Sequence, residues 1–219
     1  MSRSALVVMA RHPARGTVKT RLAPVVGEAH ARALYRAFLS DIERRFAGGR
    51  RALIWAYHPP EARFRAVVSS GARCLPQHGA DLGERMLDCF AQLSRESFDR
   101  IIMIGADVPH VRDQWLDDAE ARLDTTDVVL GPSADGGYYL VAMREPHDIF
   151  RGVAMSTRRT LADTLERARR NGLSVHLLPQ SFDIDEAEDL DRLATLLAEN
   201  GFDAVLPATA AVLRRIHRC

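Results

Sequence analysis

Lysine is almost absent from this sequence. Lysine and arginine together number 30 among 219 residues, and Lys19, in the stretch RGTVKTRLAP, is the one lysine. Arginine supplies positive charge everywhere else, so a retained ammonium indicates a position where a compact point charge fits better than a planar guanidinium. Chance is the alternative explanation, and the surrounding residues have to decide between the two.

Cysteine, net charge and long apolar runs are also scarce. The three cysteines show no CxxC or Cys/His spacing, which argues against a disulfide framework or a zinc site and favours a reducing compartment. A net charge of +1 provides no broad basic field for nucleic acid or an anionic membrane. No apolar run approaches the roughly 20 residues of a membrane span, and the run at 5–10 is too short for a secretion signal. We therefore expect a cytoplasmic protein with no membrane span and no nucleic-acid partner.

Short apolar runs alternate with longer segments of helical periodicity, which is typical of βα units around a mainly parallel sheet. Two of the runs, DVVLGP and GYYLVAM, are separated only by SADG, too short for a helix, so one of them is expected to run antiparallel. The pattern predicts a single α/β domain over 1–219 with a mixed, mainly parallel sheet flanked by helices. The helices are expected over 28–46, 60–69, 81–94, 111–123, 158–171 and 186–200, followed by a short apolar and basic tail over 202–219.

The loop after the first strand, ARHPARGTVKTRLAP, is the first candidate for chemistry, because ligands of open α/β sheets gather at the carboxyl ends of strands. It lacks the spacing of a Walker A loop and of a dinucleotide-binding turn. Its glycine, threonine, lysine and arginine nevertheless suit phosphate oxygens. The alternative is an ordinary basic surface loop.

Acidic residues follow three other strands. Asp107 ends an apolar strand and could cap a helix, form a salt bridge or bind a metal. Asp135 lies before a Gly pair, which is also an ordinary turn signal. Asp183 and Asp185 alternate with apolar residues, so an extended backbone would project both carboxylates to one side, where they repel unless a cation or base lies between them. A phosphate loop with such acids is what Mg²⁺-assisted transfer from a nucleotide requires.

Six motifs follow one another over nearly the whole chain: ARHPARGTVKTRL, QHGADLGERM, GADVP, LGPSADGGYYLVAM, MSTRRTL and FDIDEAEDL. In content and order they resemble the DUF2064, or rSAM/selenodomain-associated transferase 1, family of bacterial proteins similar to nucleotide-diphospho-sugar transferases. That family is similar in turn to 2-phospholactate guanylyltransferase and the molybdenum cofactor nucleotidyltransferases. The resemblance implies a Rossmann-like GT-A fold that binds a nucleotide with Mg²⁺, or with Mn²⁺ in its place. A shared fold does not by itself establish the reaction.

The resemblance also implies residue roles. It implies that Lys19, Arg21 and Asp107 are catalytic and that Asp107, Asp183 and Asp185 hold the metal. The nucleotide-binding residues it implies are Arg11, Gly16, Lys19, Thr20, Arg21, Gln77, Gly79, Asp81 and Gly83, and those for the acceptor are Asp135, Gly136, Gly137 and Ser156. Arg11 stands where the family commonly has lysine.

We therefore expect an enzyme, a transferase whose partners are a nucleotide and a small-molecule acceptor. The preferred hypothesis is Mg²⁺-dependent nucleotidyl transfer from an NTP to a small phosphorylated acceptor, with release of pyrophosphate. The first alternative is a GT-A glycosyltransferase that uses a nucleotide sugar, and the second is a nucleotide-binding module without turnover. No serine or cysteine nucleophile is implied, because the sequence has no GxSxG elbow.

Overall fold

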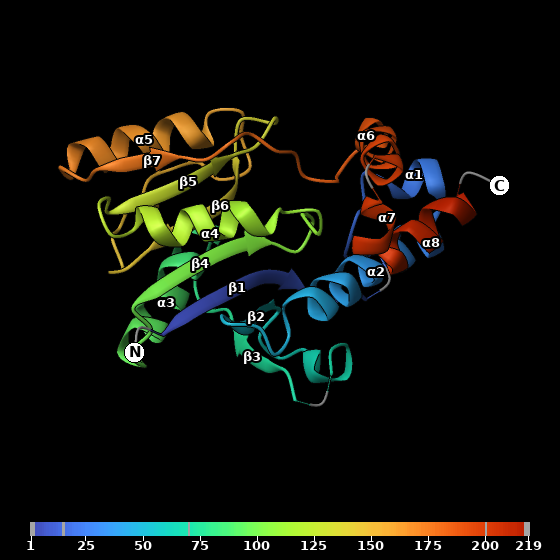
Figure 1. Ribbon diagram of the computed structural model, residues 1–219, viewed down its shortest axis with the longest axis horizontal. Coiled ribbons are helices and arrows are strands. Elements are labelled where there is room, and N and C mark those ends of the chain that lie inside the picture. Colours follow the sequence, from blue (N-terminus) through green and yellow to red (C-terminus); the bar gives the residue numbers. More distant parts are fainter. Residues whose placement is uncertain (1–2, 15, 70, 200, 217–219) are drawn as a thin grey trace.

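A seven-stranded sheet lies at the centre of the structure (Figure 1). The computed structural model describes residues 3–14, 16–69, 71–199 and 201–216. The strands are β1 (Ser4–Arg11), β2 (Ala52–His58), β3 (Arg73–Pro76), β4 (Arg100–Gly105), β5 (Val128–Pro132), β6 (Tyr138–Met143) and β7 (Val175–Leu177). Their order across the sheet is β3-β2-β1-β4-β6-β5-β7.

β6 runs against the other strands. It pairs antiparallel with both β4 and β5, whereas all other neighbouring strands are parallel. The short SADG connection imposes this reversal, because it leaves no room for a crossover helix. The predicted mixed, mainly parallel sheet of an α/β fold flanked by helices is confirmed.

Helices cover both faces of the sheet. The longer ones are α2 (Glu28–Phe46), α3 (Leu82–Arg95), α4 (Asp113–Arg122), α5 (Thr160–Arg170), α6 (Ala187–Ala198) and α8 (Pro207–Ile216), and two short ones are α1 (Ala23–Val26) and α7 (Phe202–Val205). Residues of α2, α4, α6 and α8 pack in one hydrophobic cluster, while residues of α3 and α5 pack in another. β1 shows why: Leu6 and Val8 belong to the first cluster and Val7 to the second, as the two-residue period of a strand requires.

The helix predicted over 28–46 is confirmed with the same bounds. Its buried residues include Leu34, Phe38 and Ile42, which recur every four positions and so form the apolar stripe that a helix lying on a sheet presents to the core. Gly27, with φ of 81°, separates it from α1. The periodicity of this segment was therefore sufficient to predict the helix.

The C-terminal segment is helical rather than a simple tail. α6, α7 and α8 gather with α1 and α2 at the right of Figure 1, and α8 packs against α2. The buried carboxylate of Asp41 accepts hydrogen bonds from the backbone N–H groups of Ala208 (3.1 Å) and Thr209 (2.7 Å) at the start of α8. This cap satisfies backbone N–H groups that have no partner within the helix, and it forms only when folding brings α2 and α8 together.

The helix predicted over 60–69 is wrong. The structure has only a three-residue 3₁₀ turn there, Phe64–Ala66, and Phe64 is its one buried residue. The segment begins with Pro60, directly after Pro59, and offers no continuous apolar stripe to the sheet. The edge strand β3, which follows it, was not predicted, because its four residues show no clear alternation.

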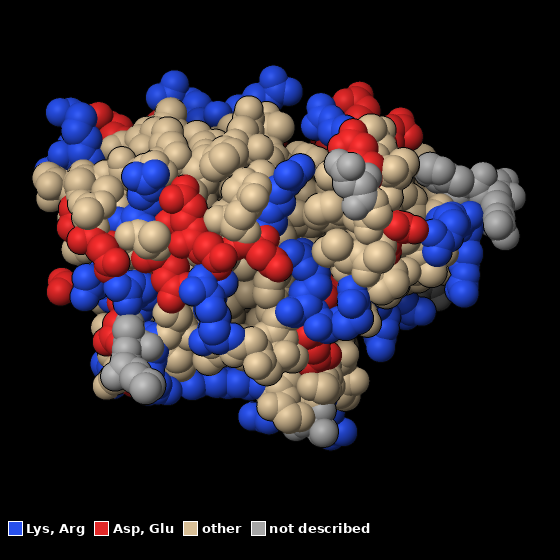
Figure 2. All heavy atoms as spheres, viewed as in Figure 1, with Lys and Arg blue, Asp and Glu red and all other residues tan. Residues whose placement is uncertain are grey.

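The face seen in Figure 2 carries acidic side chains over α4, with arginines around them. Asp117 and Glu120 pair with Arg50 and Arg51. These ion pairs join α4 to the segment just before β2, and their charges neutralise one another. Among the described residues, no helix is both long and apolar enough to cross a membrane.

Candidate active site: a cleft at the carboxyl ends of the strands

A cleft of about 550 Å³ lies where the parallel strands end and β6 begins. The loops after β1 and β4, the turn before β6 and the loop after β7 all contribute to it, so the strand ends predicted to carry chemistry do converge. The predicted site residues that line it are Arg11, Lys19, Thr20, Arg21, Gln77, Asp107, Asp135, Gly137, Ser156, Asp183 and Asp185.

Five predicted site residues are not part of the cleft lining: Gly16, Gly79, Asp81, Gly83 and Gly136. Asp81 is the N-cap of α3, and its Oδ1 accepts the backbone N–H of Glu84 at 2.8 Å. Gly136 has φ of 92°, and a side chain on it would collide with the backbone of Arg158. These two residues shape the segments that carry the lining rather than facing the cleft.

Lys19 is the centre of the acidic side of the cleft. Its Nζ lies 2.7 Å from Oδ1 of Asp185 and 3.4 Å from Oδ2 of Asp107, and its side chain is only 4% exposed. Burial alone would lower the pKa of Lys19, but attraction to Asp107, Asp185 and Asp183 outweighs it, and the pKa is raised. The ammonium is therefore held in its charged form.

The backbone of Lys19 is also unusual. Its φ of 51° lies in the left-handed region, which a residue with a β-carbon occupies at some cost. The backbone N–H groups of Leu22 and Ala23 both donate to its carbonyl at 3.0 Å, which fixes the turn. The strain is located at the residue whose side chain reaches the acids, and it adds to the argument that this lysine is functional.

Asp183 carries the most perturbed carboxyl of the cluster. The pKa of Asp183 is raised well above its usual range. Burial is the largest cause, followed by the nearby charges of Asp107, Asp135 and Asp185. The hydroxyl of Ser133 donates a hydrogen bond to its Oδ1 at 3.1 Å. Burial and the negative potential of the neighbouring acids therefore favour the protonated form of the Asp183 carboxyl in the free protein, and a bound cation would favour its ionised form.

The chain holds the acids in place by local bonds. Asp107 does not cap a helix, since the N-cap of α4 is Arg112. A side chain on Gly105 would collide with the Asp107 carboxylate, so the carboxylate keeps its present position only with glycine at 105. The backbone N–H of Ile184 donates to the carbonyl of Asp107 at 3.2 Å, which joins the loop after β4 to the loop after β7.

Asp185 is positioned by the start of α6. Oδ2 of Asp189 accepts the backbone N–H groups of Asp185 at 3.0 Å and Glu186 at 2.9 Å, as part of a capping box. The acids that open α6 thus have a structural role, as the sequence suggested. Arg21, which is 68% exposed, pairs with Glu186 at 3.5 Å.

The three acids predicted as metal ligands could hold a divalent cation. Among the described residues, no three His, Cys, Asp or Glu side chains are already arranged as a metal site, and the ammonium of Lys19 contacts two of the predicted ligands. Carboxylate oxygens are nevertheless the donors that Mg²⁺ prefers. Because the cluster is short of positive charge, its chemistry fits such an ion.

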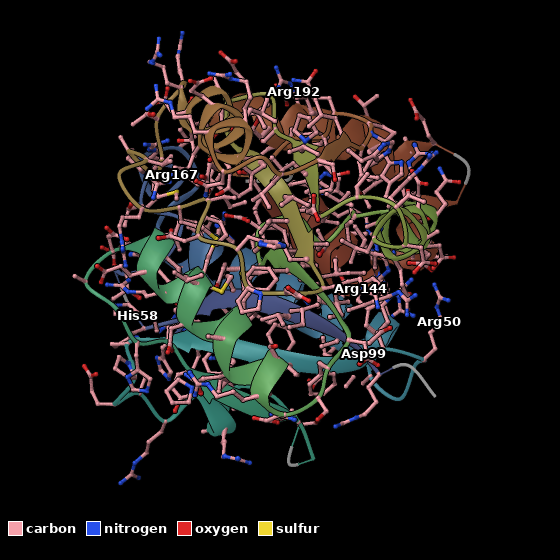
Figure 3. All side chains as sticks on the ribbon, turned by 90° about the vertical axis from the view of Figure 1, so that its left-hand side faces the viewer. Arg50, His58, Asp99, Arg144, Arg167 and Arg192 are labelled. Atoms are coloured by element: carbon pink, nitrogen blue, oxygen red, sulfur yellow. The ribbon has the colours of Figure 1, made fainter. Side chains whose placement is uncertain are left out.

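Other residues of the cleft were missed from the sequence. Leu82, Met86 and Arg85 from α3, His58 from β2 and Tyr35 from α2 all line it. A signal existed for His58, which directly follows the apolar run ALIWAY, as the chosen loop residues follow theirs. Figure 3 shows His58 beside α3. Tyr35 had no such signal in the sequence. Its hydroxyl accepts a hydrogen bond from the backbone N–H of Arg11 at 2.8 Å, and this contact depends on how α2 packs.

Comparison with known proteins relates the chain to nucleotide-using enzymes. Residues 43–157 match the family described as "Uncharacterized protein conserved in bacteria (DUF2064)". The chain is 31% identical, over 80% of its length and 84% of the relative's, to a 3-phospho-D-glycerate guanylyltransferase of Phenylobacterium zucineum. It is 26% identical, over 80% and 78%, to a 2-phospho-L-lactate guanylyltransferase of Methanothermobacter thermautotrophicus.

A solved structure extends the match over nearly the whole chain. A Desulfovibrio desulfuricans protein named as a nucleotide-diphospho-sugar transferase superposes with a TM-score of 0.88 at 32% identity and covers 99% of both chains. The resemblance inferred from the six motifs is thereby confirmed.

Proposed function

The chain belongs to the DUF2064 family, and from that premise we propose that it is a nucleotidyltransferase that moves a nucleoside monophosphate from an NTP to a small phosphorylated acceptor. Two curated relatives are named guanylyltransferases with phosphorylated acids as acceptors, which supports the reaction class and makes GTP the first donor to test. The observation that carries the proposal is the convergence of Lys19 with three carboxylates in one cleft.

The proposed reaction balances without a protein nucleophile. A phosphate oxygen of the acceptor attacks the α-phosphorus of the NTP, the bond from that phosphorus to the bridging oxygen breaks, and pyrophosphate leaves. Such transfers depend on positioning and charge stabilisation more than on covalent chemistry. The chain's part is to align the two substrates and to neutralise the charge that accumulates on their phosphates.

We assign Asp107, Asp183 and Asp185 to hold Mg²⁺ or Mn²⁺, which when bound neutralises phosphate charge that would repel the acceptor. Arg11 and Arg21 line the cleft and offer planar forks to phosphate oxygens. Gly137, directly before β6, and Ser156 also line the cleft and are proposed to contact the acceptor. In the free protein Lys19 compensates the acids. When substrate is bound, it stabilises developing negative charge.

Glycosyl transfer is the second candidate, because the Desulfovibrio desulfuricans protein that matches nearly the whole chain is named as a nucleotide-diphospho-sugar transferase. The same acids would then hold the diphosphate of a nucleotide sugar. The products separate the two reactions: nucleotidyl transfer releases pyrophosphate, whereas glycosyl transfer releases a nucleoside diphosphate. A module without turnover would release neither.

The test is a coupled assay for pyrophosphate with GTP, MgCl₂ and either 3-phospho-D-glycerate or 2-phospho-L-lactate. Release that requires both acceptor and metal supports the proposal, and Asp107→Asn serves as the impaired control. A parallel assay with nucleotide sugars measures nucleoside diphosphate. Nucleoside diphosphate without pyrophosphate would replace the first proposal by the second.

A cytoplasmic location remains part of the proposal. Cys74 and Cys89 are free in the structure, as expected for a chain in a reducing compartment. A soluble phosphorylated acceptor and an NTP are both available there. Fractionation of cells that express the tagged chain tests the location directly.

A further inference from the structure

The cationic side chains of the cleft fall into two groups. Lys19 pairs with Asp107 and Asp185, and Arg21 pairs with Glu186. Arg11 and Arg85 also line the cleft, but neither forms an ion pair with a described acidic side chain. Two of the four positive charges therefore face the cleft without a counter-charge from the protein.

The unpaired charges lie away from the acids, on the β2 side of the sheet. Arg11 ends β1 directly beside His58 at the end of β2, and β4, which leads to Asp107, lies on the other side of β1. Adjacent strands are about 4.8 Å apart, so the backbones of β2 and β4, with β1 between them, are separated by roughly 10 Å. The cleft thus has an acidic half and a basic half.

His58 carries an atom that needs a partner. Its Nδ1 is buried and has no hydrogen-bond partner among the described residues, although the ring lines the cleft. Burial and then the positive charges of Arg85 and Arg11 lower the pKa of His58, with Glu61 opposing them. Both guanidinium groups therefore act on the same imidazole, which indicates that the three side chains share one region.

Arg85 is held in place by the backbone. Its Nε donates to the carbonyl of Gly79 at 3.0 Å, and its Nη2 donates more weakly to that of Ala80 at 3.4 Å. Its Nη1 forms no hydrogen bond to a described residue, so part of the fork is available to a ligand. A fixed guanidinium loses little conformational freedom when it binds an oxyanion.

We propose that Arg11, His58 and Arg85 form a second anion subsite that binds a phosphate group of a substrate, apart from the acids around Lys19. The proposal rests on the proposed function, because it assumes a phosphate-bearing substrate in this cleft. The phosphate comes either from the polyphosphate tail of the nucleotide or from the acceptor. Both sources present the same oxyanion to two guanidinium groups and one imidazole.

The test measures binding by calorimetry, with inorganic pyrophosphate and 3-phospho-D-glycerate as separate probes, each with MgCl₂. Arg85→Met removes one fork. Arg95→Met, at the exposed far end of the same helix and outside the cleft lining, removes the same charge as the control. We expect Arg85→Met to weaken binding of one probe about tenfold and Arg95→Met to leave both unchanged. The loss should shrink as the salt concentration rises.

A second variant guards against a structural role of Arg85, which supports the Gly79 loop. His58→Ala removes a side chain that forms no hydrogen bond or ion pair with a described residue, and it should weaken binding of the same probe as Arg85→Met does. Weaker pyrophosphate binding identifies the nucleotide tail, and weaker phosphoglycerate binding identifies the acceptor. Unchanged affinity for both probes in both variants overturns the subsite. Failure of the wild-type protein to release pyrophosphate would instead overturn the proposed function and leave the binding comparison valid.

Discussion

The Nζ atom of Lys19 lies 2.7 Å from Oδ1 of Asp185, although 166 positions separate the two residues in the sequence. The same ammonium contacts Asp107, 88 positions away. One side chain thus joins the loop after the first strand to both acid-bearing loops. The free protein uses this lysine as the counter-charge of the carboxylates that we assign to a divalent cation.

Replacement of Lys19 should cost stability as well as turnover. Lys19→Met leaves the carboxylates uncompensated, and we expect the free energy of unfolding to fall by about 2–3 kcal/mol. Removal of one partner from a fully buried pair costs roughly 3–5 kcal/mol, and here Asp107 and Asp185 are partly exposed. Urea denaturation measures the change, and Arg151→Met, at a 78% exposed arginine, is the matched loss of charge.

The same variant should bind a divalent cation more tightly than the wild-type protein, because the ammonium competes for the same oxygens. Electron paramagnetic resonance of Mn²⁺ in the absence of nucleotide gives the dissociation constant. We expect it to fall several-fold in Lys19→Met and to stay unchanged in Arg151→Met. Equal or weaker Mn²⁺ binding in Lys19→Met would show that the acids do not form the cation site.

Gly105→Ala should disturb the site without unfolding the protein. The added methyl group collides with the Asp107 carboxylate, so that the carboxylate must turn away from Lys19. We expect at least a tenfold loss of pyrophosphate release and weaker Mn²⁺ binding. Gly71→Ala, where an added methyl group meets open space, is the control and should behave as wild type. Normal activity in Gly105→Ala would exclude Asp107 from the reaction.

Asp189 should act as a positioning residue. Asp189→Ala removes the acceptor of the Asp185 and Glu186 amides, so we expect a loss of about 1 kcal/mol of stability and weaker Mn²⁺ binding. Asp191→Ala, on the same helix and without these bonds, is the control. Lower stability with unchanged Mn²⁺ binding would make Asp189 a helix cap and nothing more.

His110 should make stability depend on pH. Burial and the charge of Arg45 lower its pKa to about 3, from an ordinary value of 6.5. The unfolded chain therefore binds a proton at a higher pH than the folded chain, and stability falls as the pH drops from 6.5 towards 3, by up to roughly 1.4 kcal/mol per pH unit. Urea denaturation at pH 7 and pH 5 measures the slope, which should be smaller in His110→Gln.

Local pattern carried most of the fold prediction, because the apolar stripe of α2 and the continuous apolar run of β1 are properties of the local sequence. The helix predicted over 60–69 was wrong, because this segment has no apolar face that a helix could bury against the sheet. The cap that Asp41 gives to α8 is a tertiary contact and leaves no local signal. The single domain predicted over 1–219 stays a prediction.

The site was predictable in its outline and not in its contacts. Strand ends are recognisable in the sequence, so the converging loops and their acids were found. The direct contacts of Lys19 with Asp107 and Asp185 were not predicted, because both phosphate and carboxylate attract an ammonium and the sequence does not give distances. Arg85 was overlooked inside the motif QHGADLGERM, where it looks like a solvated helix residue until its position in the cleft is known.

The hydrogen bond from Ile184 to Asp107 makes the two acid-bearing loops a single mechanical unit. The turn that carries Lys19 belongs to a different part of the chain and is attached to that unit through its side chain. Leu22 and Val18 anchor the same turn in the hydrophobic core, so a phosphate that draws the ammonium away would break the link to the acids and leave the fold of the turn in place. The bond between the two acid-bearing loops does not involve Lys19 and would persist when that link is broken.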